Sequence, residues 1–255
     1  MVEALIVVCG LAWGSFLNVV IYRLPRGLNL ALPPSHCPKC RTPIKLWHNI
    51  PVLSWLMLRG RCPTCGAHIP ATYLLVEALT PICFLILYVH FGLGSHFVLS
   101  CLFTSGLIAL GFIDLYFQIL PDAITLPGLI LGVGYAFFRE DLTLRDSLIG
   151  AVVGAGILLL VYGTYYLLRR QEGLGMGDLT LMLMVGAFLG WRGAVLTLIL
   201  GSFLGAVVGI YILVVRKKDM QFALPFGTFL TPAAFVALVW GERLIHWYLN
   251  MFQSP

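Results

Sequence analysis

Residues 148–168 read LIGAVVGAGILLLVYGTYYLL, an apolar run without a single charged side chain. Folded as an α-helix, a run of this length extends about 30 Å, which is the thickness of the hydrocarbon core of a bilayer. Its glycines Gly150, Gly154 and Gly156 have the spacing that lets membrane helices approach one another closely. We therefore predict a membrane-spanning helix that packs against a neighbour through its glycines.

Seven further apolar segments flank this one along the chain. The composition agrees with a polytopic protein, because 60% of the residues are hydrophobic and only 11% are charged. A soluble globule of this composition would lack the polar side chains to cover its surface. We predict an all-α polytopic membrane protein with about eight transmembrane helices. The seven segments are residues 2–22, 73–91, 96–113, 123–138, 174–191, 192–215 and 227–249, of which 174–191 is near the lower length limit for a full crossing.

The distribution of basic residues predicts the orientation in the membrane. With eight spans and the amino terminus outside, the Lys and Arg of residues 23–72, 169–170 and 216–218 face one side, which is twelve of the sixteen. Lys and Arg beside spans are retained in the cytoplasm, so we predict an inner-membrane protein with a cytoplasmic loop. The net charge of +5 follows from this asymmetry and indicates no nucleic-acid partner. We expect a first transmembrane helix at 1–22, the loop at 23–72 and a transmembrane domain at 73–255.

The 23–72 loop contains eight of the fourteen prolines, which excludes long helices. A module of this size has too small a hydrophobic core to fold without a disulfide or a bound metal. Two C-x-x-C pairs can provide such a cross-link: Cys37 with Cys40 and Cys62 with Cys65, separated by 21 residues. Four thiolates in this pattern predict a structural zinc site with no open position for water. The alternative is two disulfides, which a reducing cytosol disfavours.

Four carboxylates in or beside spans are candidates for chemistry: Glu77, Asp114, Asp122 and Asp178. Asp114 ends one span and Asp178 begins another, and both are expected at the cytoplasmic interface. Two carboxyl groups brought together there could share a proton, one activating water and the other protonating a leaving amine. The helix dipole favours Asp178 as the ionised base and Asp114 as the protonated acid. On spacing alone, helix caps or an interfacial ion pair explain the two aspartates equally well.

The motifs of two competing protease classes are missing from the sequence. The chain has no H-E-x-x-H motif of a zinc protease and no G-x-S-x-G motif of a serine enzyme. The acids outside the four candidates are expected to be solvated. Two loop histidines could support the zinc site, although exposure to solvent is the simpler explanation for them. These acids are Glu3, Glu140, Asp141, Asp146, Glu172, Asp219 and Glu242, and the histidines are His36 and His68.

In order along the chain, several motifs resemble the type IV prepilin peptidase family. The resemblance implies a bifunctional enzyme that cleaves the leader of prepilins or pseudopilins after a glycine and then methylates the new amino terminus with S-adenosylmethionine. It implies that Asp114 and Asp178 are the catalytic pair, that Asp122 is not, and that the four cysteines bind zinc. The substrates would carry a basic leader and a hydrophobic helix lying in lipid. The motifs are Gly14 to Pro25, Cys37 to Cys65 with Asn49 to Leu56 and Arg59 to Cys62 between, Asp114 to Asp122, Gly175 to Asp178, and Pro225 to Gly227.

Two positions depart from the family pattern. Thr180 stands where a lysine is expected, and Thr228 stands where a proline often follows Pro-Phe-Gly. The sequence has no glycine-rich nucleotide-binding loop that would mark a methyl-donor site, so Glu77 is the candidate for that site. The alternative is that Glu77 is a buried carboxyl group bonded to a neighbouring helix. Two other functions stay open: a non-catalytic zinc-loop assembly factor, and a small proton-coupled transporter.

Overall fold

The computed structural model describes residues 1–139, 142–170, 175–216 and 224–253. Within these ranges the secondary structure is helical apart from two isolated β-bridges in the loop. The chain divides into two compact units, residues 1–109 and 110–255. Several positions interpreted from the sequence lie outside the described residues: Glu140, Asp141, Glu172, Gly173, Leu174, Lys217, Lys218 and Asp219.

The first unit is built on α1 (Val2–Arg23) and α3 (Ala71–Phe91), with the start of α4 (Ser95–Phe117). Glycines on α1 allow its backbone to approach α3 closely. A Cβ added to Gly10 would lie 2.7 Å from Pro81 Cα, and one added to Gly14 would lie 3.0 Å from Glu77 Cα. Larger side chains at either position would push the two helices apart, so these glycines set how closely α1 and α3 pack.

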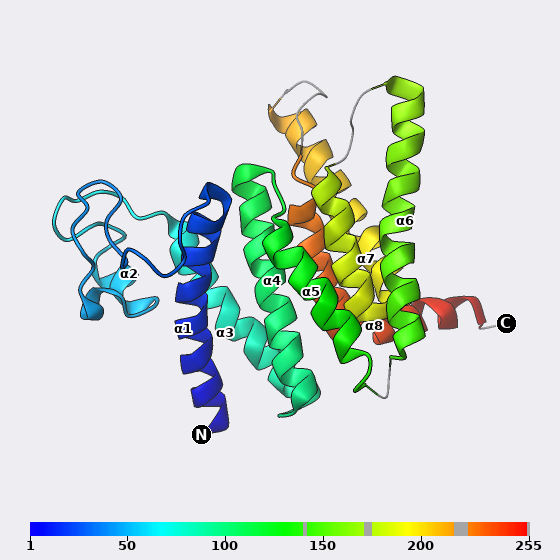
Figure 1. Ribbon diagram of the computed structural model, residues 1–255, viewed down its shortest axis with the longest axis horizontal. Coiled ribbons are helices and arrows are strands. Elements are labelled where there is room, and N and C mark those ends of the chain that lie inside the picture. Colours follow the sequence, from blue (N-terminus) through cyan, green and yellow to red (C-terminus); the bar gives the residue numbers. More distant parts are fainter. Residues whose placement is uncertain (140–141, 171–174, 217–223, 254–255) are drawn as a thin grey trace. The chain divides into compact units, whose positions relative to one another are not determined.

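The loop between α1 and α3 contains only short helical turns, η1 (Leu24–Arg26), η2 (Leu46–His48) and α2 (Leu53–Met57), as its prolines predict. Figure 1 shows the loop running out from the end of α1. The buried Arg23 side chain at the end of α1 fixes where this loop begins. It donates to the carbonyl oxygens of Asn29 at 2.9 Å, Leu30 at 3.2 Å and Pro33 at 2.6 Å. Each bond joins a charged donor to a backbone acceptor, so the arginine holds the first ten loop residues against α1.

The second unit contains the end of α4 with α5 (Asp122–Tyr135), α6 (Leu144–Arg169), α7 (Met176–Arg216) and α8 (Gly227–Gln253). Glycines form the contact between α6 and α7, as the glycine spacing within residues 148–168 predicts. A Cβ added to Gly150 would collide with Gly186 O, and one added to Gly186 would collide with Gly150 O. The helix backbones therefore touch directly at this pair.

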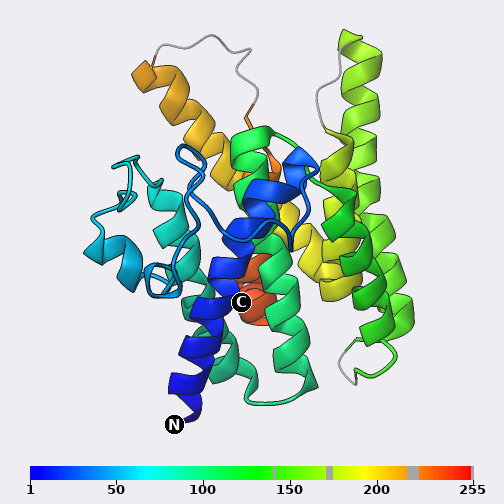
Figure 2. The ribbon, with the colours of Figure 1, turned by 60° about the vertical axis from the view of Figure 1, so that its left-hand side comes forward.

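Helix α7 reverses direction at Gly190, whose backbone has φ 71° and ψ 177°. A Cβ added to Gly154 of α6 would lie 2.9 Å from Met182 O and 3.3 Å from Ala194 Cβ. In a straight helix these two residues would be about 18 Å apart. The chain must therefore turn back between them, and glycine is the residue that tolerates this φ. Figure 2 shows the change of direction within the yellow part of the ribbon.

Six helices of the described chain are long and apolar enough to cross a membrane: α1, α3, α4, α6, α7 and α8. The shorter apolar helix α5 occupies the predicted segment 123–138. The two halves of α7 on either side of Gly190 correspond to the predicted segments 174–191 and 192–215. The fold class, an all-α polytopic membrane protein, is confirmed. Large side chains of α6 that face outward, such as Val152, Leu160 and Leu167, are apolar, as contact with lipid requires.

We predict that Gly186→Leu destabilises the second unit severely, because the new side chain would overlap the Gly150 backbone, which cannot move aside as a flexible side chain would. Overpacking of this kind costs about 1–3 kcal/mol or more. Gly156→Leu is the matched control, since a Cβ added there meets nothing within 4 Å. Thermal unfolding in detergent should show a clear loss of melting temperature for the first variant only, and equal melting of both would contradict the close contact.

Candidate active site

The two aspartates lie at the helix ends where the sequence predicts them. Asp114 is in the last turn of α4, and Asp178 is in the first turn of α7. Both side chains are buried, with 5% and 7% of their surface exposed. Buried carboxylates at helix ends are costly unless they are paired or functional.

Asp114 is held by the amino-terminal turn of α8. The backbone N–H of Thr228 donates to Asp114 Oδ2 at 2.7 Å, and the Thr228 hydroxyl lies 3.1 Å from the same oxygen. That hydroxyl is also 3.3 Å from Gly111 O. A Cβ added to Gly227 would lie 3.0 Å from Asp114 Oδ2, so the backbone of α8 approaches the carboxylate directly. The Pro-Phe-Gly motif thus places a helix start on the first aspartate.

Asp178 has a different environment. Its backbone N–H donates to Gly175 O at 3.1 Å, which forms the tight entry to α7. Its Oδ1 is buried and has no hydrogen-bond partner within the described residues. The charge of Asp114 acts on it directly. A buried carboxyl oxygen without a hydrogen bond to the described protein, close enough to a second carboxylate to be affected by its charge, is suited to accept a hydrogen bond or to carry a proton.

Leu120 brings the two aspartate segments together. This half-buried residue follows α4. A Cβ added to Gly177 would lie 2.8 Å from Leu120 Cβ, and one added to Gly227 would lie 2.9 Å from Leu120 Cδ1. The glycines next to Asp178 and Thr228 therefore pack on one leucine. Nothing in the sequence marks Leu120 as the residue on which these two glycines pack.

Asp122 lies at the start of α5, exposed, and joins a different set of contacts. The buried Thr125 hydroxyl lies 3.4 Å from Asp122 Oδ1 and 3.3 Å from the Thr180 hydroxyl. Thr180 in turn donates to Gly177 O at 3.0 Å. Thr180 therefore ties the first turn of α7 to α5 without adding a charge.

The four loop cysteines converge on one point. All four Sγ atoms lie within 4.8 Å of one another, with Cys37 and Cys65 at 3.8 Å and Cys40 and Cys62 at 4.0 Å. A tetrahedron of thiolates with Zn–S bonds of about 2.3 Å has S···S separations of about 3.8 Å. A disulfide requires about 2.05 Å, so these positions fit a metal and do not fit the disulfide alternative.

Two similar knuckles produce this convergence. In one, Arg41 N donates to Cys37 O at 2.8 Å, and in the other Gly66 N donates to Cys62 O at 2.9 Å. Hydrogen bonds with Thr42 lower the pKa of the Cys40 thiol to about 6, so this thiol ionises readily. Backbone hydrogen bonds likewise lower the pKa of Cys62. His36 and His68 lie in the flanking bridges and are not members of the cluster.

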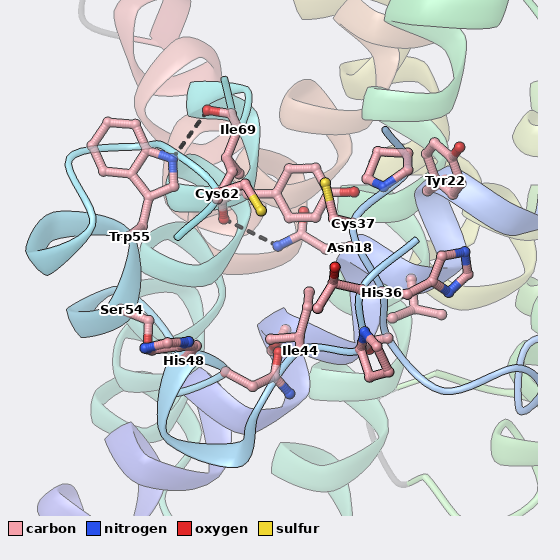
Figure 3. Close-up of a pocket in the computed structure, with 18 of the residues that line it drawn as sticks. Asn18, Tyr22, His36, Cys37, Ile44, His48, Ser54, Trp55, Cys62 and Ile69 are labelled. Atoms are coloured by element: carbon pink, nitrogen blue, oxygen red, sulfur yellow. Dashed lines mark hydrogen bonds between the residues drawn. The ribbon is translucent and has the colours of Figure 1, made fainter. Parts of the chain in front are cut away.

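A cavity of about 840 Å³ opens between the loop, α1 and α3 in the first unit. Figure 3 shows Asn18 and Tyr22 of α1 facing Cys37, Trp55 and Ile69 of the loop. Trp55 Nε1 donates to Ile69 O at 3.3 Å, which fixes the indole at the cavity wall.

Glu77 of α3 also lines this cavity and is buried. Its Oε2 accepts a hydrogen bond from Val52 N at 2.7 Å. Val52 has φ 64°, a conformation that β-branched residues rarely adopt. The Glu77 carboxylate thus holds a strained turn of the loop at the cavity, a role the sequence did not reveal.

Comparison with known proteins identifies the class to which these features belong, a leader peptidase with a separate amino-terminal domain. The family model described as "Bacterial Peptidase A24 N-terminal domain" matches residues 8–91, and "Type IV leader peptidase family" matches residues 101–210. No solved structure gives a significant match.

Curated relatives extend over nearly the whole chain. A prepilin leader peptidase/N-methyltransferase of Pseudomonas putida is 40% identical over 93% of this chain and 90% of its own length. Proteins of the same name from Aeromonas hydrophila and Pseudomonas aeruginosa are each 38% identical, covering 98% and 96% of this chain and 94% and 92% of their own lengths. The chain belongs to the type IV leader peptidase family, as its motifs predict.

Proposed function

We propose that this protein cleaves the leader peptide of prepilins or pseudopilins after a glycine and then methylates the new amino terminus. The observation that carries the peptidase half is the pair of buried aspartates, Asp114 and Asp178, brought together around Leu120. This arrangement and the family favour the enzyme over a scaffold or a transporter.

The hydrogen bonds support one assignment of the acid and base roles. Asp114 receives two donors from Thr228, which stabilise its charged form, so it acts as the base that takes a proton from water. Asp178, with Oδ1 unpaired and a negative neighbour, holds the proton that goes to the leaving amine. The water oxygen bonds to the scissile carbonyl carbon, the C–N bond breaks, and the products are a leader carboxylate and a pilin amine.

This assignment is the reverse of the one that the helix dipole suggests. The dipole contributes about 0.3–1 kcal/mol at an exposed helix end, whereas a hydrogen bond to a charged group contributes about 1.5–3 kcal/mol. Two such bonds on Asp114 therefore outweigh its position at a carboxyl end.

The substrate follows from the location of the site. We place the site at the cytoplasmic face of the inner membrane, because the basic ends of α1 and α6 and the basic loop share that side in the predicted topology. A prepilin with a basic leader and a hydrophobic helix would hold its helix in lipid and leave the leader in the cytoplasm. The scissile bond after glycine would then reach the boundary where Asp114 and Asp178 lie.

The methyl donor belongs in the cavity of the first unit. Its volume of about 840 Å³ falls in the range of small-molecule sites. Tyr22, Trp55 and Tyr73 supply aromatic faces for an adenine ring, and the Glu77 carboxylate supplies a charge opposite to a sulfonium. S-adenosylmethionine presents both groups. The zinc site is proposed to shape one wall, since Cys37 and Cys62 line the cavity.

We predict that Glu77→Gln raises the KM for S-adenosylmethionine about tenfold or more and leaves cleavage unchanged. The amide oxygen can still accept from Val52 N, so the strained turn is kept while the charge is lost. Glu77→Ala removes both and should weaken the donor further. If Glu77→Gln and the wild type had the same KM for S-adenosylmethionine, this cavity would not be the methyl-donor site.

One assay tests the proposed function as a whole. Detergent-purified protein is incubated with a prepilin that has a glycine cleavage site and with labelled S-adenosylmethionine, and the product is read by mass. The expected product is shortened to the residue after glycine and carries one methyl group. An intact substrate with well-folded enzyme would argue against the peptidase, and an unmethylated product would confine the function to proteolysis.

A further inference from the structure

We propose that Thr228 is a positioning residue for the peptidase reaction, which orients the Asp114 carboxylate and keeps it charged through its backbone N–H and its hydroxyl. This inference rests on the proposed aspartic peptidase function. It concerns one of the two positions at which the chain departs from the family pattern, where proline often follows Pro-Phe-Gly.

The backbone donor comes from the structure of α8. The first N–H groups of a helix have no partner within the helix. Helix α8 begins at Gly227, so Thr228 N is one of these donors, and it lies 2.7 Å from Asp114 Oδ2. A helix start also favours a negative charge beside it. The carboxylate therefore satisfies a donor of a half-buried residue that has no partner within the helix.

The hydroxyl adds a second donor on the same oxygen. Thr228 Oγ1 lies 3.1 Å from Asp114 Oδ2 and 3.3 Å from Gly111 O, one turn earlier on α4. Gly111 and Asp114 lie on one face of α4, and the threonine side chain spans them. With both donors on Oδ2, the other carboxyl oxygen of Asp114 is left for water and substrate.

In the described part of the chain, few other charged groups lie on the helices that pack around Asp114. Helix α7 contributes Asp178, the titratable group that interacts with it electrostatically. Helix α5 contributes Asp122, which is exposed and contacts Thr125. On α4 the other titratable side chains are Tyr116, which is exposed, the buried Cys101, and His96 near the opposite end. On α8 the first charged residue is Glu242, fourteen residues from Thr228. Among the residues that the structure describes, Thr228 therefore supplies the hydrogen bonds that stabilise a negative Asp114.

Three substitutions separate the two donors. Thr228→Ser keeps both, Thr228→Val keeps the N–H alone, and Thr228→Pro removes both while remaining compatible with the first turn of a helix. We expect wild-type kcat for the serine variant. The valine variant should lose about tenfold in kcat, and the proline variant about a hundredfold. In the last two, a carboxylate with fewer donors is protonated more easily, so the acidic limb of the pH profile of kcat should move to higher pH by about one unit for each bond lost.

The readouts distinguish this inference from the function on which it rests. Methylation of an already cleaved pilin should be unchanged in all three variants, and a wild-type melting temperature in detergent shows that the unit containing Thr228 is folded in each. If Thr228→Val and Thr228→Pro keep the wild-type kcat and pH profile while Asp114→Asn is inactive, the positioning role is wrong and the peptidase stands. If Asp114→Asn itself cleaves normally, the proposed function fails first.

Discussion

Asp114→Asn and Asp178→Asn are each expected to lower the rate of leader cleavage about a thousandfold or more, while methylation of an already cleaved pilin continues. Each change removes one partner of a proton transfer, and a single general acid or base contributes about 10²–10⁴ to a rate. The amide keeps the size of the side chain. At position 114 it also keeps an oxygen that can accept from Thr228 N.

The matched control is Asp122→Asn, eight residues from Asp114. Its carboxylate is exposed and contacts the Thr125 hydroxyl at 3.4 Å, which an amide oxygen can also do. We expect cleavage within a few-fold of wild type. The measurement is the initial rate of prepilin processing in detergent, with melting temperature recorded for each variant. A strong loss of stability in both Asn variants, with cleavage proportional to the folded fraction, would support a merely structural pair.

Much of this architecture follows from local rules. Apolar length fixes the membrane helices, because a backbone in lipid must satisfy its own hydrogen bonds. The C-x-x-C spacing fixes the cysteine cluster, because each knuckle is formed by bonds within six residues, such as Cys37 N to Thr42 O at 3.0 Å. Asp114 and Asp178 could be placed at helix ends for the same reason, since Pro121 and Gly175 interrupt the chain beside them.

What the sequence left open depends on contacts between distant segments. Thr228 is separated from Asp114 by more than a hundred residues, and no local pattern indicates that its N–H points at that carboxylate. The reversal at Gly190 agrees with the predicted boundary between the segments 174–191 and 192–215, but no local pattern shows that Gly190 is the residue with the positive φ. The dipole argument for the acid and base considered each helix separately, so it missed the donors that α8 brings.

Loss of the zinc site is expected to have the second large effect. Chelation, or Cys62→Ser, should release about one zinc ion per chain and abolish methylation. Structural zinc contributes about 10–16 kcal/mol to the folding of small zinc-binding peptides, and this loop has no other core of comparable strength. Cys37 and Cys62 are buried and line the cavity, so an opened loop would lose the wall of the proposed methyl-donor site.

A cysteine outside the cluster provides the control for this prediction, and the thiol pKa values give the direction in which zinc binding changes with pH. Cys9→Ser changes an exposed thiol outside the cluster and should retain zinc and methylation. Hydrogen bonds with Thr42 lower the pKa of Cys40 to about 6, whereas desolvation and the neighbouring thiols raise the pKa of Cys65 to about 11, so zinc must displace a proton from Cys65 at neutral pH. Because protons compete with the metal for the thiolates, zinc should be retained at neutral pH and released as the pH falls. Metal analysis of purified protein at decreasing pH, with methylation assayed in parallel, measures both. If a reductant without a chelator abolished methylation and no zinc were found, disulfides would hold the loop.

Because Asp114 and Asp178 belong to the other compact unit, cleavage should decline less than methylation at each step of zinc loss.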